Sequence, residues 1–145
     1  MVGWLKKQSA AGICGDRPSY QMRSDQRFMA AIDFFTEVQQ IVIERKEGFI
    51  RDGLQSEFEA LRHSGFAFIL ASSQLPLARS AAHIPRLLNK IDTAAISFVA
   101  DCDRLAFFAK NQDVTYMMDG LKRATDHVFA TAEAEYRPRS AQAFW

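Results

Sequence analysis

Residues 83–110, HIPRLLNKIDTAAISFVADCDRLAFFAK, carry the longest regular pattern of apolar side chains in the chain. The apolar positions alternate spacings of four and three residues: Ile84, Leu88, Ile91, Ala95, Phe98, Cys102, Leu105 and Ala109. This spacing places them on one side of an α-helix and is typical of a seam between nearly parallel or antiparallel helices. The sequence therefore predicts one long helix from Ile84 to Ala109, with Pro85 in its first turn.

Two more helices are predicted before this seam. The first begins at Ser24 or Asp25, because either residue can cap a helix. Its apolar stripe consists of Phe28, Ile32, Phe35, Val38 and Val42. Gly48 and Gly53 bracket the stretch that we predict as the first turn, although glycines can also lie within a bent helix.

The second predicted helix begins between Asp52 and Ser56 and ends before Pro76. Ser56 and Glu59 match a capping box, in which each side chain bonds a free amide group of the first turn. The inward stripe of this helix consists of Leu54, Phe58, Leu61, Gly65 and Phe68.

A fourth helix is predicted from the polar turn at 110–113 to about Tyr136, before Pro138. Its inward positions are Val114, Met118, Leu121, Thr125, Val128 and Ala132. Four helices of roughly 20 residues with short connections favour an antiparallel up-and-down four-helix bundle. We therefore expect an all-α domain over residues 24–136, with an irregular N-terminal arm at 1–23 and a C-terminal tail at 137–145.

The composition excludes several classes of protein. The 145 residues include 18 Lys and Arg against 17 Asp and Glu, for a formal net charge of +1, and 48% of them are apolar. These values fit one globular domain and lack the basic excess of a nucleic-acid-binding protein. No apolar run reaches the roughly 18 residues of a transmembrane span, and no apolar stretch follows the first lysines as in a secretory signal. We expect a cytoplasmic protein in which Cys14 and Cys102 are free thiols.

Motifs for catalysis, metals and cofactors are missing from the sequence. Neither of the two glycine-rich phosphate-binding patterns occurs, nor does the Gly-x-Ser-x-Gly nucleophile elbow. No acidic residue stands three positions before His63, His83 or His127, as di-iron bundles require. Glu59 and His63 could share a cation, but a salt bridge or a solvated pair is the commoner arrangement. We therefore predict no catalytic residue, no metal and no cofactor, and an enzyme is the least favoured function.

The feature that departs from a plain monomeric bundle is surplus apolar surface on the second and third predicted helices. The second helix is apolar on all sides between residues 65 and 71, and the third carries large side chains outside its seam. Because a bundle offers each helix one inward face, the extra residues need a central helix position, cover from the N-terminal arm, or a partner. We predict that a protein partner or a second copy contacts Phe66, Ile69, Leu70, Phe107 and Phe108. The leading hypothesis is a non-enzymatic protein–protein interaction module: an adaptor, a chaperone-like protein or a regulatory subunit.

The histidines support an alternative hypothesis, a small-ligand-binding or signalling bundle. In an antiparallel bundle His63 and His127 fall at similar heights, beside the core seam, so they could form a pH-sensitive layer. Two partly exposed histidines are the simpler interpretation. His83 is the third candidate for a ligand-binding or pH-sensing role.

Basic residues are spread along the chain and alternate with acidic ones, except near the start of the third helix. Arg79, Arg86 and Lys90 form the densest basic area there. We consider them candidates for binding an anion, an acidic partner or a phospholipid head group.

Overall fold

The computed structural model describes residues 24–137, so the predicted arm at 1–23 and residues 138–145 of the tail lie outside the described part of the chain. Its elements are α2 (Ser24–Ile43), α3 (Lys46–Arg51), α4 (Gln55–Ser73), the 3₁₀ turn η2 (Leu75–Leu77), α5 (His83–Phe108) and α6 (Gln112–Glu135). Within 24–137 no residue lies in a strand. The prediction of an all-α protein is confirmed for these residues.

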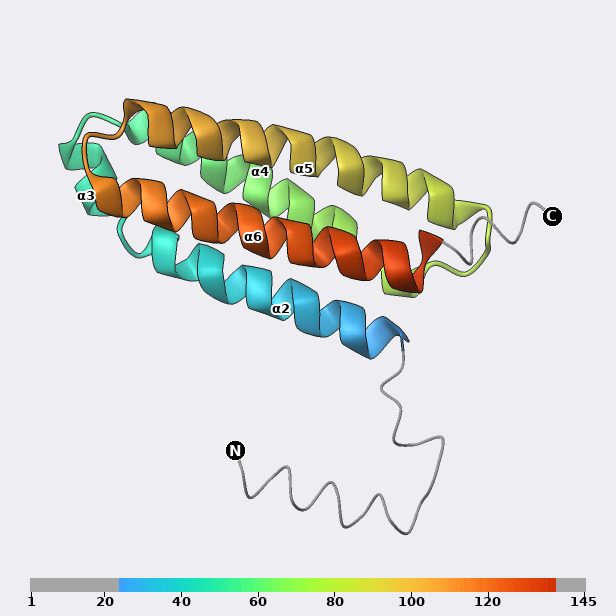
Figure 1. Ribbon diagram of the computed structural model, residues 1–145. Coiled ribbons are helices and arrows are strands. Elements are labelled where there is room, and N and C mark those ends of the chain that lie inside the picture. Colours follow the sequence, from blue (N-terminus) through green and yellow to red (C-terminus); the bar gives the residue numbers. More distant parts are fainter. Residues whose placement is uncertain (1–23, 138–145) are drawn as a thin grey trace, which may run out of the picture.

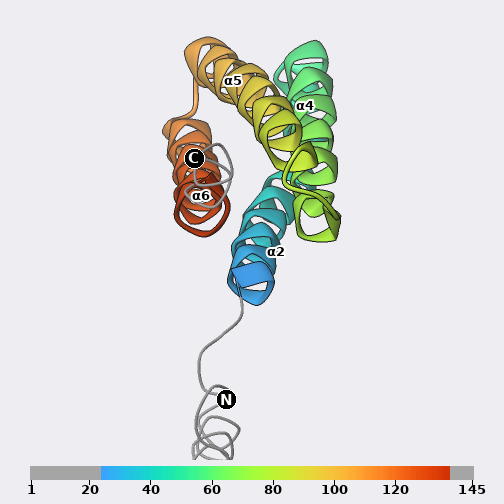
Figure 2. The same ribbon diagram turned by 90° about the vertical axis from the view of Figure 1, so that its right-hand side faces the viewer.

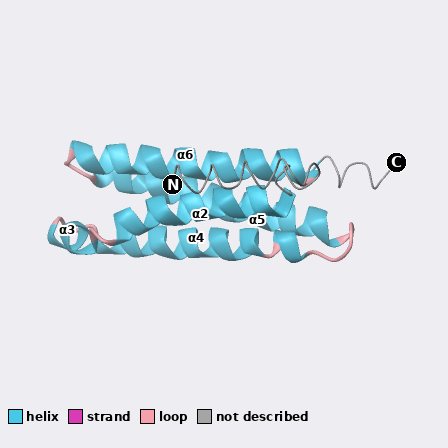
Figure 3. Cartoon of the chain, turned by 90° about the horizontal axis from the view of Figure 1, so that it is seen from below, coloured by secondary structure: helices cyan, strands magenta, loops and turns pink. Residues whose placement is uncertain are grey.

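The four long helices lie side by side, and each runs opposite to the one before it (Figures 1 and 2). Packing joins α2 most closely to α6 and α4 most closely to α5, while α5 also packs on α6. Of the four neighbouring helix pairs, α2 and α4 share the least extensive contact. Seen from below, short loops join the helices, and α3 lies at one end (Figure 3).

The first connection differs from the predicted turn. The chain leaves α2 through a turn at residues 44–45 and forms the short helix α3, which contains Gly48. Of the two glycines that bracket this connection, only Gly53, with φ of 78°, has the left-handed backbone of a turn residue. Phe49 is buried and stacks on Phe58 of α4 at 5.1 Å between ring centroids, which explains why six residues with a central glycine stay helical.

The predicted capping box is wrong. Helix α4 begins at Gln55, and its N-cap is Leu54, which makes no side-chain capping bond. Glu59 instead forms ion pairs with Arg62 at 3.3 Å and Lys46 at 3.6 Å. The turn before α6 contains a side-chain cap, because the Asp113 amide donates to Asn111 Oδ1 at 2.8 Å.

The predicted stripes form the core. Every predicted inward position of α4 and α6 is buried, as is the α5 seam from Ile84 to Leu105, whereas Ala109 and Val38 of α2 are half-buried. At the centre, each long helix contributes a phenylalanine to one cluster: Phe35, Phe68, Phe98 and Phe129. The Phe35 ring lies 5.1 Å from that of Phe68 and 5.2 Å from that of Phe98, in edge-to-face geometry. Such contacts add about 0.5–1.5 kcal/mol per pair beyond apolar burial.

A glycine lets the helices approach closely beside this cluster. A Cβ atom on Gly65 of α4 would lie 2.9 Å from Phe98 Cε1 of α5 and 2.9 Å from Gln39 Cδ of α2. Both distances are too short for a real side chain, and the Phe98 ring is held in the core. Gly65 is therefore required by packing and not by backbone conformation.

We predict opposite effects of alanine at two helical glycines. Gly65→Ala should lower the free energy of unfolding by about 1–3 kcal/mol, because overpacking exceeds the gain of about 1 kcal/mol in helix propensity. Gly120→Ala in α6 is the matched control, since nothing lies within 4 Å of its Cβ position, and it should stabilise the protein by about 0.5–1 kcal/mol. Urea denaturation measures both changes. Equal stabilisation by the two variants would contradict the close approach at Gly65.

Candidate functional site

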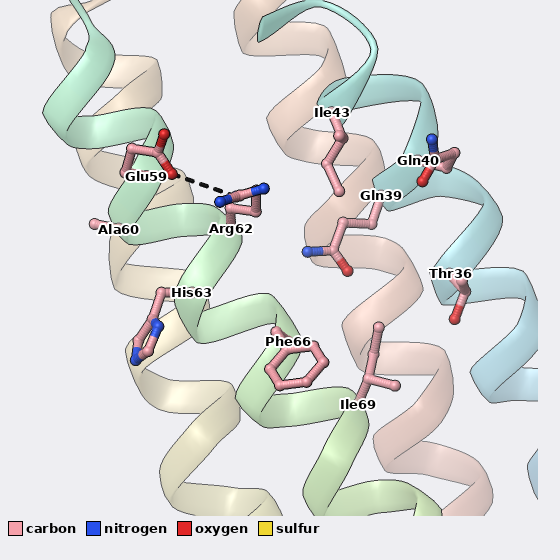
Figure 4. Close-up of a pocket in the computed structure, with 10 residues that line it drawn as sticks. All are labelled: Thr36, Gln39, Gln40, Ile43, Glu59, Ala60, Arg62, His63, Phe66 and Ile69. Atoms are coloured by element: carbon pink, nitrogen blue, oxygen red, sulfur yellow. Dashed lines mark ion pairs between the residues drawn. The ribbon is translucent and has the colours of Figure 1, made fainter.

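A groove opens where α2 and α4 diverge. The two helices are joined through α3 and pack mainly on other partners, α2 on α6 and α4 on α5. The groove has a volume of about 810 Å³. It is lined from α2 by Thr36, Gln39, Gln40 and Ile43, and from α4 by Glu59, Ala60, Arg62, His63, Phe66 and Ile69 (Figure 4).

Phe66 and Ile69 supply the apolar part of this α2–α4 groove. Phe66 is 63% exposed although it belongs to a helix that also supplies the core, while Ile69 is half-buried and packs on the core. Both side chains come from the turns of α4 that carry Gly65 and Phe68 on the inward face. The groove therefore presents an aromatic ring that the described residues leave largely in solvent.

Gln39 is the buried polar group of the groove. Only 5% of this residue is exposed, yet its side-chain amide makes no hydrogen bond with any residue that the structure describes. The side chain extends from α2 towards α4, over the surface that Gly65 leaves open (Figure 4). Its amide oxygen and nitrogen are not among the fully buried polar atoms that lack a hydrogen bond, so they keep contact with solvent at the groove. The amide offers a donor and an acceptor to a group that enters the groove.

The predicted α2 stripe omits Gln39, although its spacing in the sequence indicates a core position. Gln39 stands four residues after Phe35 and three before Val42, so it occupies a core position of the α2 stripe. A polar residue at such a position indicates either a hydrogen-bonded core group or a binding site.

The charged end of the groove is internally paired. Glu59 contacts Arg62 on the same helix and Lys46 of α3, and all three side chains are more than a third exposed. Such surface pairs contribute about 0–1 kcal/mol each. The Glu59 carboxylate thus forms the salt bridge that the sequence favours over a cation shared with His63.

The three histidines lie at separate places. His63 borders the α2–α4 groove, and His127 of α6 packs edge-to-face on Phe34 of α2 with ring centroids 5.8 Å apart. His83 is the first residue of α5 and lines a hollow beside the connection from α4. All three are exposed, and no hydrogen bond or ring contact joins His63 to His127 among the described residues. Helices α4 and α6 occupy diagonal corners (Figure 2).

The residues predicted to bind a partner are divided among three places. Phe66 and Ile69 lie in the α2–α4 groove, whereas Leu70 lines a hollow between α4 and α5. Phe107 and Phe108 stand at the end of α5, where their rings contact each other at 5.2 Å. The predicted set therefore does not form one surface. Of the basic candidates, Arg79 and Arg86 line the hollow that contains His83, and Lys90 lines the adjoining one with Arg86.

Cys102 is a core residue of the α5 seam. It is a free thiol without solvent exposure, and burial raises its pKa from 9.0 to about 12, with Lys122 lowering and Asp103 and Asp101 raising it by smaller amounts. Cys14 lies outside the described residues. Among residues 24–137 no group of three or more histidine, cysteine or acidic side chains could hold a metal ion.

We predict that Cys102 makes the protein less stable at high pH. The native state keeps the thiol proton up to about pH 12, while the unfolded chain loses it above about pH 9. The Cys102 contribution to stability is therefore complete below pH 9 and declines by about 1.4 kcal/mol per pH unit as pH rises between these values. The difference in unfolding free energy between a Cys14→Ser background and Cys14→Ser/Cys102→Ala measures this decline. A difference that stays constant from pH 8 to pH 11 would contradict it.

Comparison with known proteins found no matching family model, no similar curated protein and no similar solved structure. None of the described helices combines the length and the apolar character needed to cross a membrane.

Proposed function

We propose that this protein is a non-enzymatic helical protein–protein interaction module. The four long helices form an antiparallel up-and-down bundle, and the α2–α4 groove receives an apolar segment of a second copy or of another protein. The observation that carries the proposal is Phe66, a phenylalanine 63% exposed beside a groove of about 810 Å³. The buried free thiol of Cys102 is compatible with a reducing compartment, so we retain the cytoplasm as the proposed location.

Two features of the groove favour a protein segment as its occupant. Burial of a phenylalanine side chain is worth about 1.5–3 kcal/mol, so covering Phe66 supplies apolar binding energy. The Gln39 amide, which reaches solvent at the groove and has no hydrogen-bond partner among the described residues, can donate to a peptide carbonyl and accept from a peptide N–H. An apolar anchor beside a polar group that fixes orientation is a common pattern at protein interfaces.

The chemistry of the groove favours binding over catalysis. Its carboxylate, Glu59, is paired with Arg62 and Lys46, and its histidine, His63, has no hydrogen-bonded acidic partner among the described residues. General acid–base catalysis needs such groups within hydrogen-bond reach of each other and of a substrate.

We predict that Phe66→Glu abolishes the complex that the groove forms. If the occupant is a second copy, wild-type protein should be a dimer or larger, and the variant should be a monomer with unchanged helicity. Light scattering and circular dichroism measure both properties. Ile96→Glu is the matched control, because Ile96 of α5 is 70% exposed but does not line the groove, and it should leave the mass unchanged.

Other results of this experiment separate the remaining possibilities. A lower melting temperature without a change of mass would mean that Phe66 is covered by the chain's own residues 1–23 or 138–145, and deletion of the covering segment would then lower the melting temperature as well. A folded monomer, unaltered by Phe66→Glu, would remove the main support for the proposal.

We predict that Gln39→Met separates stability from binding. Methionine has a similar shape, and the Gln39 amide makes no hydrogen bond with the described residues, so the variant should change the unfolding free energy of the free protein by less than about 1.5 kcal/mol. The same substitution should weaken the complex, since it removes the amide that orients the occupant. Loss of stability together with unchanged binding would show that Gln39 has only a structural role.

The alternative function, binding of a small ligand with His63, has one observation in its favour. His63 borders the groove, whose volume lies within the range of small-molecule sites, about 300–1,000 Å³. Native mass spectrometry of the purified protein distinguishes the two functions. A bound small mass that disappears in His63→Ala would favour the alternative, whereas a multiple of the chain mass that disappears in Phe66→Glu would favour the interaction module.

A further inference from the structure

The outer side of the α4–α5 pair carries a second concave surface, separate from the α2–α4 groove. Two hollows of about 630 Å³ and 290 Å³ adjoin there, and both are lined by Gln74 and Arg86. We call them together the α4–α5 basic groove. Its α4 side is apolar, with Ala67, Leu70 and Ala71, while its α5 side carries Arg86 and Lys90.

The cations of this groove are unusual in lacking acidic neighbours. Arg79, Arg86 and Lys90 make no ion pair with any described residue, and no acidic residue is among those that line either hollow. Asp92, the nearest acidic residue along α5, is engaged on the other side by Arg137, at 3.3 Å. Positive charge is thus concentrated locally on a chain whose formal net charge is only +1.

The position of these charges is unfavourable for the free protein. Arg86 lies in the first turn of α5, which contains no acidic residue, so a cation faces the positive end of the helix dipole. Lys90 follows four residues later on the same helix face, where like charges repel. A negatively charged partner relieves both repulsions.

Exposed leucines complete the surface. Leu70 in the larger hollow is 50% exposed, and Leu77 at the edge of the smaller one is 73% exposed. An apolar floor with cations along one side is complementary to a helix that carries an apolar stripe with acidic residues beside it. Basic membrane-binding surfaces, by contrast, usually gather four to eight cations on a face that can lie flat on a bilayer.

We infer that the α4–α5 basic groove docks an acidic amphipathic helix of a partner protein. The apolar stripe of that helix contacts Leu70 and Leu77, and its carboxylates pair with Arg86, Lys90 and Arg79. The inference does not depend on the α2–α4 groove, because the two surfaces lie on different sides of α4.

The test uses two labelled model peptides of about 18 residues, roughly five helical turns. One carries a leucine stripe flanked by glutamates, and the other is identical except for lysines in place of the glutamates. Fluorescence anisotropy should show binding of the glutamate peptide, weakened by added NaCl, and at least about tenfold weaker binding of the lysine peptide.

Charge reversal in the groove should invert this preference. Arg86→Glu/Lys90→Glu should weaken binding of the glutamate peptide at least about tenfold and strengthen that of the lysine peptide. The matched control, Arg51→Glu/Arg123→Glu, changes the net charge equally at exposed cations outside the groove and should leave the preference intact. Leu70→Glu should weaken binding of both peptides. Arg86→Glu alone should raise the melting temperature of the free protein, which a purely structural role of Arg86 would not do.

Four outcomes would overturn the inference. The glutamate peptide could fail to bind at about 1 mM, or bind equally well to the charge-reversed protein. Vesicles of equal parts phosphatidylserine and phosphatidylcholine could bind in an Arg86- and Lys90-dependent manner while the peptide does not, which would make the surface a membrane site. Self-association that depends on Arg86 and Lys90, without peptide binding, would make the occupant a second copy.

Discussion

Edge-to-face contact between Phe35 of α2 and the rings of Phe68 and Phe98 holds three helices together at the middle of the molecule. Phe129 of α6 extends the same cluster. The neighbouring Gly65 allows this contact, because a side chain there would collide with Phe98 and with Gln39. Since packed aromatic rings tolerate little displacement, this aromatic contact fixes the distance between α2 and α4 on either side of it.

The arrangement explains why one turn of α4 is apolar on every side. Phe68 faces the core, Phe66 and Ile69 face the α2–α4 groove, and Leu70 faces the α4–α5 basic groove. One helix therefore serves two concave surfaces of different character, one neutral and lined by the Gln39 amide, the other cationic. The α4–α5 basic groove can dock a partner even if the chain itself covers the α2–α4 groove.

Local sequence patterns predicted the four long helices and their inward faces. The short helix α3 and the groove depend on how the helices pack in three dimensions. The four apolar stripes follow from helical periodicity, which adjacent residues determine among themselves. Helix α3 was not predicted, because Gly48 resembles a turn residue in the sequence. The helix depends on stacking of Phe49 on Phe58 of α4, which a local pattern does not show. The α2–α4 groove was not predicted, because it depends on which helix pairs pack closest. For the same reason the residues predicted to bind a partner lie at three separate places. The sequence predicted surplus apolar surface at Phe66 and a basic area at the start of α5. It indicated Gln39 only as a polar residue on an apolar stripe.

The two ends of the described chain lie next to each other. Arg27 near the start of α2 pairs with Glu135 at the end of α6 at 2.7 Å, and the rings of Phe28 and Tyr136 stand 5.3 Å apart beside them. A host protein can therefore carry residues 24–137 as an insert within a single surface loop, with both junctions at one pole. By the same geometry, a circularly permuted chain that joins α6 to α2 and opens between α4 and α5 keeps every long helix intact, and it would begin next to the basic residues of α5.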